Sequence, residues 1–281
     1  AYGDAMEWND VDGIVAEFYD PRAETSDSRR YFLNAPTSTA DAWVAHHEWS
    51  ACRRRYHVPP EEGEDPGPGE GEVLAVKQRQ LITLGFDGSR HRSDAVTDAT
   101  ALIGCRVSDG HLFELGVWEQ PLGPDGRGWQ VPALEVDAAV RDAFTKYRVV
   151  GFYADPAKWE TYVAQWEAAF GSKLKVKATR NNPIEWWMTG GRSQSTVRAL
   201  AQFHGAIVDG ELTHDGSFAL TRHVLNAKRR PTTSGLQIAK EHPESPRKID
   251  AAVAAVLAWQ ARLDVLAAGI GAKRTGFVPR R

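Results

Sequence analysis

The chain has 281 residues, of which 42% are hydrophobic and 25% charged, and its formal net charge is −3. This composition is ordinary for a globular protein with one large domain, or with a domain and an appendage. It excludes a protein coated in positive charge, and the lack of any apolar run of 18 residues excludes a membrane-spanning helix. Two cysteines are too few for a disulfide framework or a four-cysteine zinc site, and they indicate a reducing cytoplasm.

A stretch rich in proline, glycine and acidic residues, residues 59–71, marks the clearest boundary in the chain. It offers no apolar side chain to bury, so we expect an exposed linker or long loop. Before it, residues 39–55 carry Trp43 and Trp49 in a helix-like pattern. We therefore expect a front segment over residues 1–72 and a main domain over residues 73–281.

Two kinds of periodicity alternate after this boundary. Apolar runs and alternation predict strands over residues 80–87, 99–107, 111–118, 148–154, 174–178 and 234–239. Helical spacing predicts helices over residues 132–147, 156–170, 194–208, 217–227 and 246–268, the last with Ser245 as its N-cap. A meander followed by a helix crossover predicts an α/β domain with a ribonuclease H-like mixed sheet flanked by helices. Periodicity alone leaves several other α/β folds open.

Three aspartates stand at positions where carboxylates need an explanation. Asp87 and Asp155 end two apolar strands, and sites in open α/β sheets form at that carboxyl edge. Gly85 and Gly88 flank the first aspartate and leave room for a ligand or another backbone. Asp250 shares the apolar face of the last helix, which should pack on the sheet, so its carboxylate needs a partner.

A divalent cation shared by the three carboxylates would supply that partner. Carboxylates without a histidine or cysteine ligand set suit Mg²⁺ or Mn²⁺. Two such ions about 4 Å apart can activate a water and stabilise the leaving oxygen of a phosphodiester. The simpler interpretation makes each aspartate a turn or cap residue: Asp155 precedes Pro156, and Asp250 would interact favourably with the helix dipole. The ordered trio favours the metal site.

Three short motifs carry a resemblance to a known family. They are Leu84-Gly-Phe-Asp-Gly-Ser-Arg90, Gly151-Phe-Tyr-Ala-Asp-Pro156 and Arg247-Lys-Ile-Asp-Ala-Ala-Val-Ala254. In this order they resemble the nuclease domain of phage terminase large subunits, over about residues 73–269. Residues 29–34, followed by Asp41-Ala-Trp43, are similar to the segment that joins the ATPase of this motor to its nuclease.

The resemblance implies a ribonuclease H-like fold and a two-metal endonuclease that cuts double-stranded viral DNA during genome packaging. Asp87, Asp155 and Asp250 would be the catalytic residues and would bind two Mg²⁺ or Mn²⁺ ions, with Asp94 as an auxiliary acidic residue. The implied partners are double-stranded DNA, the portal protein, the small terminase subunit and the procapsid. The implied location is the host cytoplasm and, transiently, the procapsid portal, with no membrane partner.

Basic residues near the aspartates are candidates for DNA binding. Arg90 and Arg92 follow the first strand, and Lys248 precedes the last aspartate, so we expect these three to contact phosphates. A solvated basic turn explains the two arginines equally well. No Gly-x-x-x-x-Gly-Lys-[Ser/Thr] motif occurs in the sequence. We therefore expect the C-terminal part of a longer protein, without ATPase activity of its own.

Two other functions remain open. A junction resolvase or integrase-type enzyme could use the same fold, although the joining segment before Pro59 argues against it. A module that docks on the portal or on DNA without catalysis could also retain this fold. The sequence does not distinguish the preferred metal or the oligomeric state.

Overall fold

The computed structural model describes residues 41–58, 67–89, 98–121, 123–188, 192–242 and 245–271. Its centre is a five-stranded sheet in the order β6-β3-β4-β5-β7. The strands are β3 (Leu81–Asp87), β4 (Thr100–Arg106), β5 (His111–Trp118), β6 (Arg148–Ala154) and β7 (Thr213–His214). The first three form an antiparallel meander, and helix α4 (Ala133–Lys146) crosses over to β6, which runs parallel to β3. This topology confirms the predicted ribonuclease H-like α/β class.

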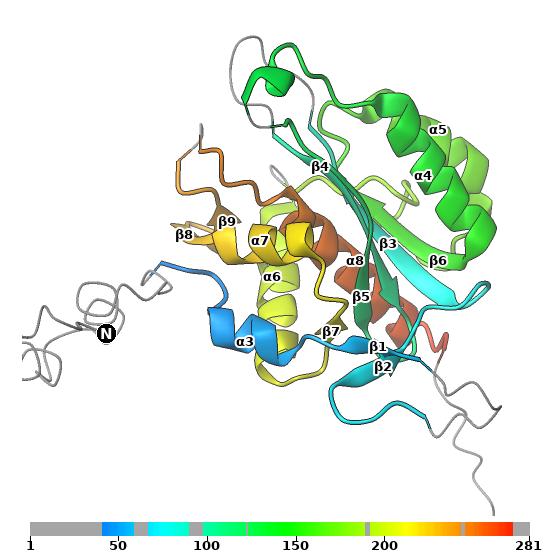
Figure 1. The fold of residues 1–281 in the computed structure, drawn as a ribbon. Helices are drawn as coiled ribbons and strands as arrows, with labels where there is room; N and C mark the ends of the chain where they lie inside the picture. The colour runs from blue at the N-terminus through cyan, green and yellow to red at the C-terminus, as the bar shows by residue number, and fades with distance from the viewer. Residues whose placement is uncertain are drawn as a thin grey trace, which may run out of the picture.

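Helices cover both faces of the sheet (Figure 1). Helix α4 and helix α5 (Glu160–Phe170) lie on one face, and α8 (Asp250–Ala267) lies on the other. Behind α8 are α6 (Ser193–Val208), α7 (Phe218–Asn226) and the short α3 (His46–Ala51). Two small sheets complete the described chain: β1 (Arg55–His57) with β2 (Glu72–Leu74), and β8 (Lys228–Thr232) with β9 (Gly235–Ala239). The short 3-10 helices are η2 (Gly123–Gly126) and η3 (Gly171–Lys173).

Helix α8 lies directly on β3 because one strand residue has no side chain. A Cβ at Gly85 would lie 1.9 Å from the carbonyl oxygen of Ala254 and 2.4 Å from the amide nitrogen of Ala258. The hydroxyl of Thr83 donates a hydrogen bond to the carbonyl of Ala258 at 2.7 Å and fixes the same approach. The room predicted at Gly85 is therefore occupied by another backbone. This contact fixes the position of α8 on β3, and therefore the position of the first residue of α8 relative to the strand ends.

Several predicted boundaries were wrong. The strand expected over residues 174–178 is absent: Lys175 N–H donates to Val150 of β6, but Ala178 N–H turns to Pro183 and no ladder forms. The last helix begins at Asp250, and Ser245 instead accepts the N–H of Arg247, so it is not the cap. The helix expected over residues 156–170 begins at residue 160, after a turn. Within the described part of residues 39–55, only residues 46–51 are helical.

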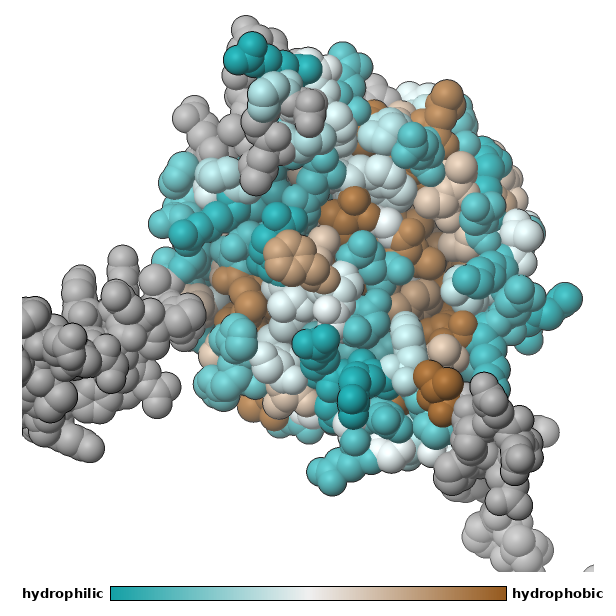
Figure 2. All heavy atoms as spheres, viewed as in Figure 1, coloured by the Kyte–Doolittle hydropathy of each residue, from teal (hydrophilic) through white to brown (hydrophobic). Residues whose placement is uncertain are grey.

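The surface is mixed. Figure 2 shows a face on which polar residues predominate and apolar residues reach the surface in separate small groups. Among the described residues, no helix is both long enough and apolar enough to cross a membrane.

Candidate functional site

Two predicted site residues lie at the ends of neighbouring strands. Asp87 is the last residue of β3, and the parallel register pairs Phe86 with Ala154, the last residue of β6. The next residue, Asp155, donates its backbone N–H to the carbonyl of Phe86 at 3.0 Å. The parallel pairing therefore brings both aspartates to the same edge of the sheet, as the sequence predicts.

The turn after Asp87 is held by a buried tryptophan. A Cβ at Gly88 would lie 2.4 Å from the indole ring of Trp159, so only glycine fits beneath this ring. The indole N–H of Trp159 donates to the carbonyl of Ser89 at 3.0 Å. Gly88 thus makes room for the side chain of Trp159, which directly precedes α5 and fixes the end of β3 through its hydrogen bond to Ser89.

The third aspartate is buried and incompletely satisfied. Asp250 is the first residue of α8 and is 7% exposed. Its Oδ2 is buried without a hydrogen-bond partner among the described residues. An unpaired buried carboxylate costs several kcal/mol, by order of magnitude, unless a proton or a cation compensates it. Asp250 therefore has the property predicted for it: a carboxylate that requires a positive partner.

The three carboxylates share one electrostatic environment. Burial raises the pKa of Asp87 well above its usual value, and the charges of Asp250 and Asp155 raise it further. Burial raises the pKa of Asp250 to about 6, with the charge of Asp98 adding to the shift. Burial also raises the pKa of Asp155. Each raised pKa means that the negative charge of the ionised carboxylate is not compensated by its surroundings. A bound cation would stabilise that charge and lower the pKa.

Asp155 differs from the other two aspartates. It is 9% exposed, and its Oδ1 accepts the N–H of Ala157 at 3.2 Å, so it also forms the turn that the simpler interpretation assigned to it. A second backbone donor, the N–H of Met188, opposes the rise in its pKa. Across the described ranges, no group of three histidine, cysteine or acidic side chains is arranged to hold a metal ion. The charge of each of the other two aspartates acts on Asp87, but the three carboxylates are not arranged as a complete ligand set.

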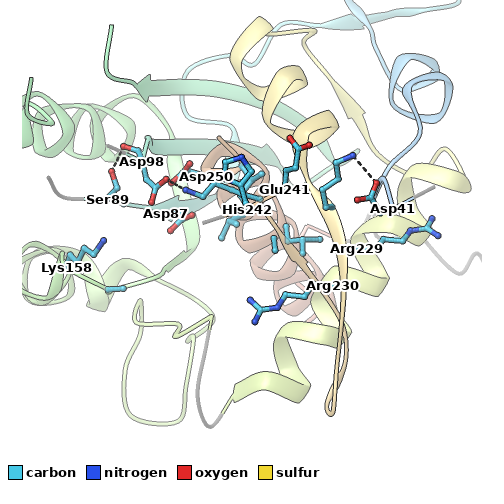
Figure 3. A pocket seen from close by; sticks show the side chains of 18 residues that line it. Asp41, Asp87, Ser89, Asp98, Lys158, Arg229, Arg230, Glu241, His242 and Asp250 are labelled. Atoms are coloured by element: carbon cyan, nitrogen blue, oxygen red, sulfur yellow. Dashed lines mark hydrogen bonds and ion pairs between the residues drawn. The ribbon is translucent and has the colours of Figure 1, made fainter. Parts of the chain in front are cut away.

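A cavity of about 750 Å³ opens beside the carboxylates, and we call it the acidic cavity. Asp87, Asp98 and Asp250 line it and lie together in Figure 3. Cationic residues also line it, most of them on or beside the β8–β9 hairpin: Lys158, Lys228, Arg229, Arg230 and Lys240. One part of the cavity lining, formed by Asp87, Asp98 and Asp250, is therefore acidic, and the part at the β8–β9 hairpin carries most of the basic residues.

Asp98 is a site residue that the sequence interpretation missed. It accepts a hydrogen bond from Lys240 at 2.5 Å, and the ammonium of Lys248 lies 3.8 Å from the same oxygen. The sequence did offer a signal, because Asp98 directly precedes the strand predicted over residues 99–107, and in an antiparallel pair the start of the second strand lies beside the end of the first. The pairing of Asp87 with Ala101 in the structure agrees with this position.

The remaining predicted residues have different outcomes. Arg90, Arg92 and Asp94 lie outside the described residues. Lys248 is 6% exposed, and burial lowers the pKa of its ammonium group, whose charge faces Asp98. Its contact with DNA stays a prediction, whereas the structure shows its ammonium group close to the carboxylate of Asp98.

Comparisons with known proteins give relatives from phages. The chain is 40% identical over 267 residues to the Gene 13 protein of Mycobacterium phage D29 and 41% identical over 271 residues to the Gene 13 protein of Mycobacterium phage L5. Each match covers 95% of this chain and 42% of the relative, so the chain spans less than half the length of these curated relatives. No family model matches the chain.

Solved structures of large terminases resemble the fold. The HK97 bacteriophage large terminase has a TM-score of 0.48 at 15% identity, covering 84% of this chain and 47% of that one. The large terminase nuclease from thermophilic phage G20c with bound magnesium has a TM-score of 0.46 at 10% identity, covering 79% and 98%. These neighbours come from the family whose motifs the sequence resembles.

Proposed function

We propose that the chain is a metal-dependent endonuclease that cuts double-stranded DNA, as the nuclease part of a phage terminase large subunit. The observation that carries this proposal is the buried Oδ2 of Asp250, which has no hydrogen-bond partner among the described residues. Asp250 lines the acidic cavity together with Asp87. A structural carboxylate in a protein interior would normally be paired. A carboxylate left unpaired beside other carboxylates is suited to a divalent cation.

The residues present fit such a cation in their chemistry. Asp87, Asp155 and Asp250 would hold two Mg²⁺ or Mn²⁺ ions, because all three offer oxygen ligands and all three have raised pKa values that a cation would reverse. The ions would supply an activated water and stabilise the charge of the phosphodiester during hydrolysis. Asp94, as an auxiliary acidic residue, belongs to the same proposal.

The protein's own residues would orient the DNA. Arg229 and Arg230 are exposed on β8 and line the acidic cavity, so they can neutralise phosphates of the strand that enters it. Arg90, Arg92 and Lys248 are further candidates for this role. Phosphate contacts position DNA without reading bases, so we expect weak sequence selectivity and binding that weakens with salt.

The biological setting follows from the same proposal. The relatives are phage proteins more than twice as long as this chain. As part of such a protein, the nuclease would make the cuts that begin and end genome loading, in the host cytoplasm and at the procapsid portal. The portal protein and the small terminase subunit would then be its partners.

Plasmid cleavage with Mn²⁺ or Mg²⁺ tests the proposal. We expect the intact chain to nick and linearise supercoiled plasmid, and we expect Asp87→Asn and Asp250→Ala to remove this activity, with EDTA giving the same loss. Cleavage confined to four-way junctions would instead identify a resolvase. A wild-type chain that binds DNA but has no metal-dependent cleavage under any of these conditions would identify a docking module.

A further inference from the structure

The first turn of α8, which carries Asp250, is not capped by its own sequence. The N-cap residue, Ile249, provides no side-chain hydrogen bond. The first N–H groups of a helix have no partner within the helix and need one from elsewhere. For Ala251 that partner is the imidazole of His223 on α7, whose Nδ1 accepts the N–H at 2.9 Å. His223 is completely buried, so water does not compete for this contact.

The orientation of this imidazole is fixed from its other side. Because Nδ1 accepts a hydrogen bond, the ring proton is on Nε2, which donates to Oε1 of Glu119 at 2.7 Å. Glu119 follows directly after β5. Its two carboxylate oxygens also accept hydrogen bonds from Nη2 of Arg222, each at 2.5 Å. Burial raises the pKa of Glu119, but the hydrogen bonds from His223 and Arg222 outweigh it and hold the pKa below its usual value. A carboxylate, an imidazole and a helix amide therefore form one continuous chain.

A second contact from α7 reaches the residues just before the helix. The side-chain amide of Asn226 donates to the carbonyl of Lys248 at 3.0 Å. Asn226 lies three residues after His223, so the two side chains share one face of α7. Asn226 binds the backbone of residue 248 and His223 binds that of residue 251, so the two contacts lie on either side of Asp250 in the sequence.

We propose that His223, oriented by Glu119, is a positioning residue for the carboxylate of Asp250 in the metal centre. This inference rests on the proposed function, because it assigns His223 a role in the same site. The hydrogen bonds of the imidazole go to Glu119 and to the N–H of Ala251, and not to the carboxylate of Asp250. The imidazole acts through the N–H of Ala251, and so through the backbone from which the Asp250 side chain projects. Partners that orient metal-binding carboxylates commonly change metal affinity by roughly 10- to 100-fold when removed.

The test compares His223 with a matched histidine far from the acidic cavity. His214 is 1% exposed, its Nδ1 accepts the N–H of Gly216 at 3.1 Å, and its Nε2 contacts the carbonyl of Trp49 at 2.9 Å. The two rings thus make the same kinds of hydrogen bond. The variants are His223→Leu, His223→Asn, which keeps an acceptor near the Nδ1 position, and His214→Leu as the control. Glu119→Gln tests the inference in the event that His223→Leu does not fold.

The primary measurement is Mn²⁺ binding by calorimetry, without DNA and well below every unfolding midpoint. We expect His223→Leu to weaken Mn²⁺ binding by roughly 10-fold or more, His223→Asn to recover most of that loss, and His214→Leu to change it by less than about twofold. Glu119→Gln should weaken binding in the same direction. Hydrogen exchange of the metal-free protein should show a faster amide at Ala251 in His223→Leu alone.

The outcomes separate the two proposals. A wild-type chain that neither binds Mn²⁺ nor cleaves plasmid contradicts the proposed function itself. Wild-type binding together with unchanged affinity in His223→Leu, or in Glu119→Gln if the former does not fold, overturns the positioning role. Equal weakening in His214→Leu also overturns it, because a general loss of stability would then explain both.

Discussion

The two ends of β3 and β6 carry cavities of similar size, of which one is lined by both acidic and basic side chains and the other by basic ones. The acidic cavity, at the carboxyl ends, has a volume of about 750 Å³. At the amino ends, a cavity of about 710 Å³ is lined by Arg79, Arg148, Lys173 and Lys175, and we call it the basic cavity. No acidic residue is among its described lining residues.

Burial is what separates the two cavities. The four cationic residues of the basic cavity are all exposed, so water solvates their charges at little cost. In the acidic cavity, Asp250 is buried with an unpaired oxygen, and its pKa is raised to about 6. A folded protein tolerates such a group only where something compensates it. Cavity volume and local charge therefore do not favour either cavity as the site, whereas the uncompensated buried charge supports the proposal for the acidic cavity.

The largest expected effect concerns Asp155, the predicted metal ligand that does not line the acidic cavity. In Asp155→Asn the amide oxygen still accepts the N–H of Ala157, so the turn and the fold should persist. Loss of the charge should reduce plasmid cleavage by about a hundredfold or more, equivalent to about 3 kcal/mol in the barrier. Circular dichroism and a cleavage time course measure the two effects.

A matched control exists in another turn. The carboxylate of Asp215 accepts the N–H groups of Ser217 and Glu114, at 2.9 and 3.1 Å, away from both cavities. Asp215→Asn should leave cleavage within about twofold of wild type, since this half-buried carboxylate does not line the acidic cavity. Full activity in Asp155→Asn would reduce this aspartate to a turn former.

The contact beneath the acidic cavity should matter for stability. Gly85→Ala would force a Cβ against the backbone of Ala254, and we expect a loss of about 3 kcal/mol in the free energy of unfolding. Gly205→Ala is the control: this helical glycine has nothing within 4 Å of the added Cβ, and the change should stabilise by about 0.5–1 kcal/mol. Urea unfolding of the metal-free proteins measures both. Similar behaviour of the two variants would contradict the close packing of α8 on β3.

The pH dependence of the metal-free protein should reveal the buried charge. The pKa of Asp250 is raised to about 6 in the folded state. The folded state therefore holds the proton more tightly than the unfolded state, whose pKa is near 3.9, and stability is lost as pH rises from about 4 to about 6. The loss is of order 2–3 kcal/mol by pH 7. Asp250→Asn should recover it at pH 7 and gain little at pH 4, as measured by urea unfolding at both values. An equal gain at both pH values would contradict this origin.

The smallest expected effect compares the cations of the two cavities. Arg229→Ala with Arg230→Ala removes two charges from the acidic cavity, and should weaken DNA binding several-fold and reduce the salt slope by roughly 2. Arg148→Ala with Lys175→Ala removes two charges from the basic cavity and should change binding by less than about twofold. Fluorescence anisotropy with duplex DNA in EDTA, over a range of salt, measures both. Equal effects would mean that DNA also lies across the amino ends of the strands.

Local patterns in the sequence determined much of this fold. Strand and helix periodicities are local properties, so β3, β4, β5, β6 and most helices were predicted within a few residues. The strand ends placed Asp87 and Asp155 at one edge, and the apolar face of the last helix predicted that Asp250 would be buried. Boundaries were less certain, because Ser245 looks like a cap in sequence and the contact that caps α8 comes from another helix.

Only the tertiary structure decided which partners these residues meet. Asp98 meets Lys240 across 142 residues, and His223 reaches Ala251 across 28, so no local pattern contains either contact. The hairpin that brings Arg229 and Arg230 to the acidic cavity depends in the same way on the packing of β9 against α6. The sequence by itself predicted three aspartates as candidates for the chemistry, and their roles stay a prediction. Their burial, their partners and the unpaired oxygen of Asp250 depend on how distant segments pack, because free energies of burial and pairing arise only when those segments meet.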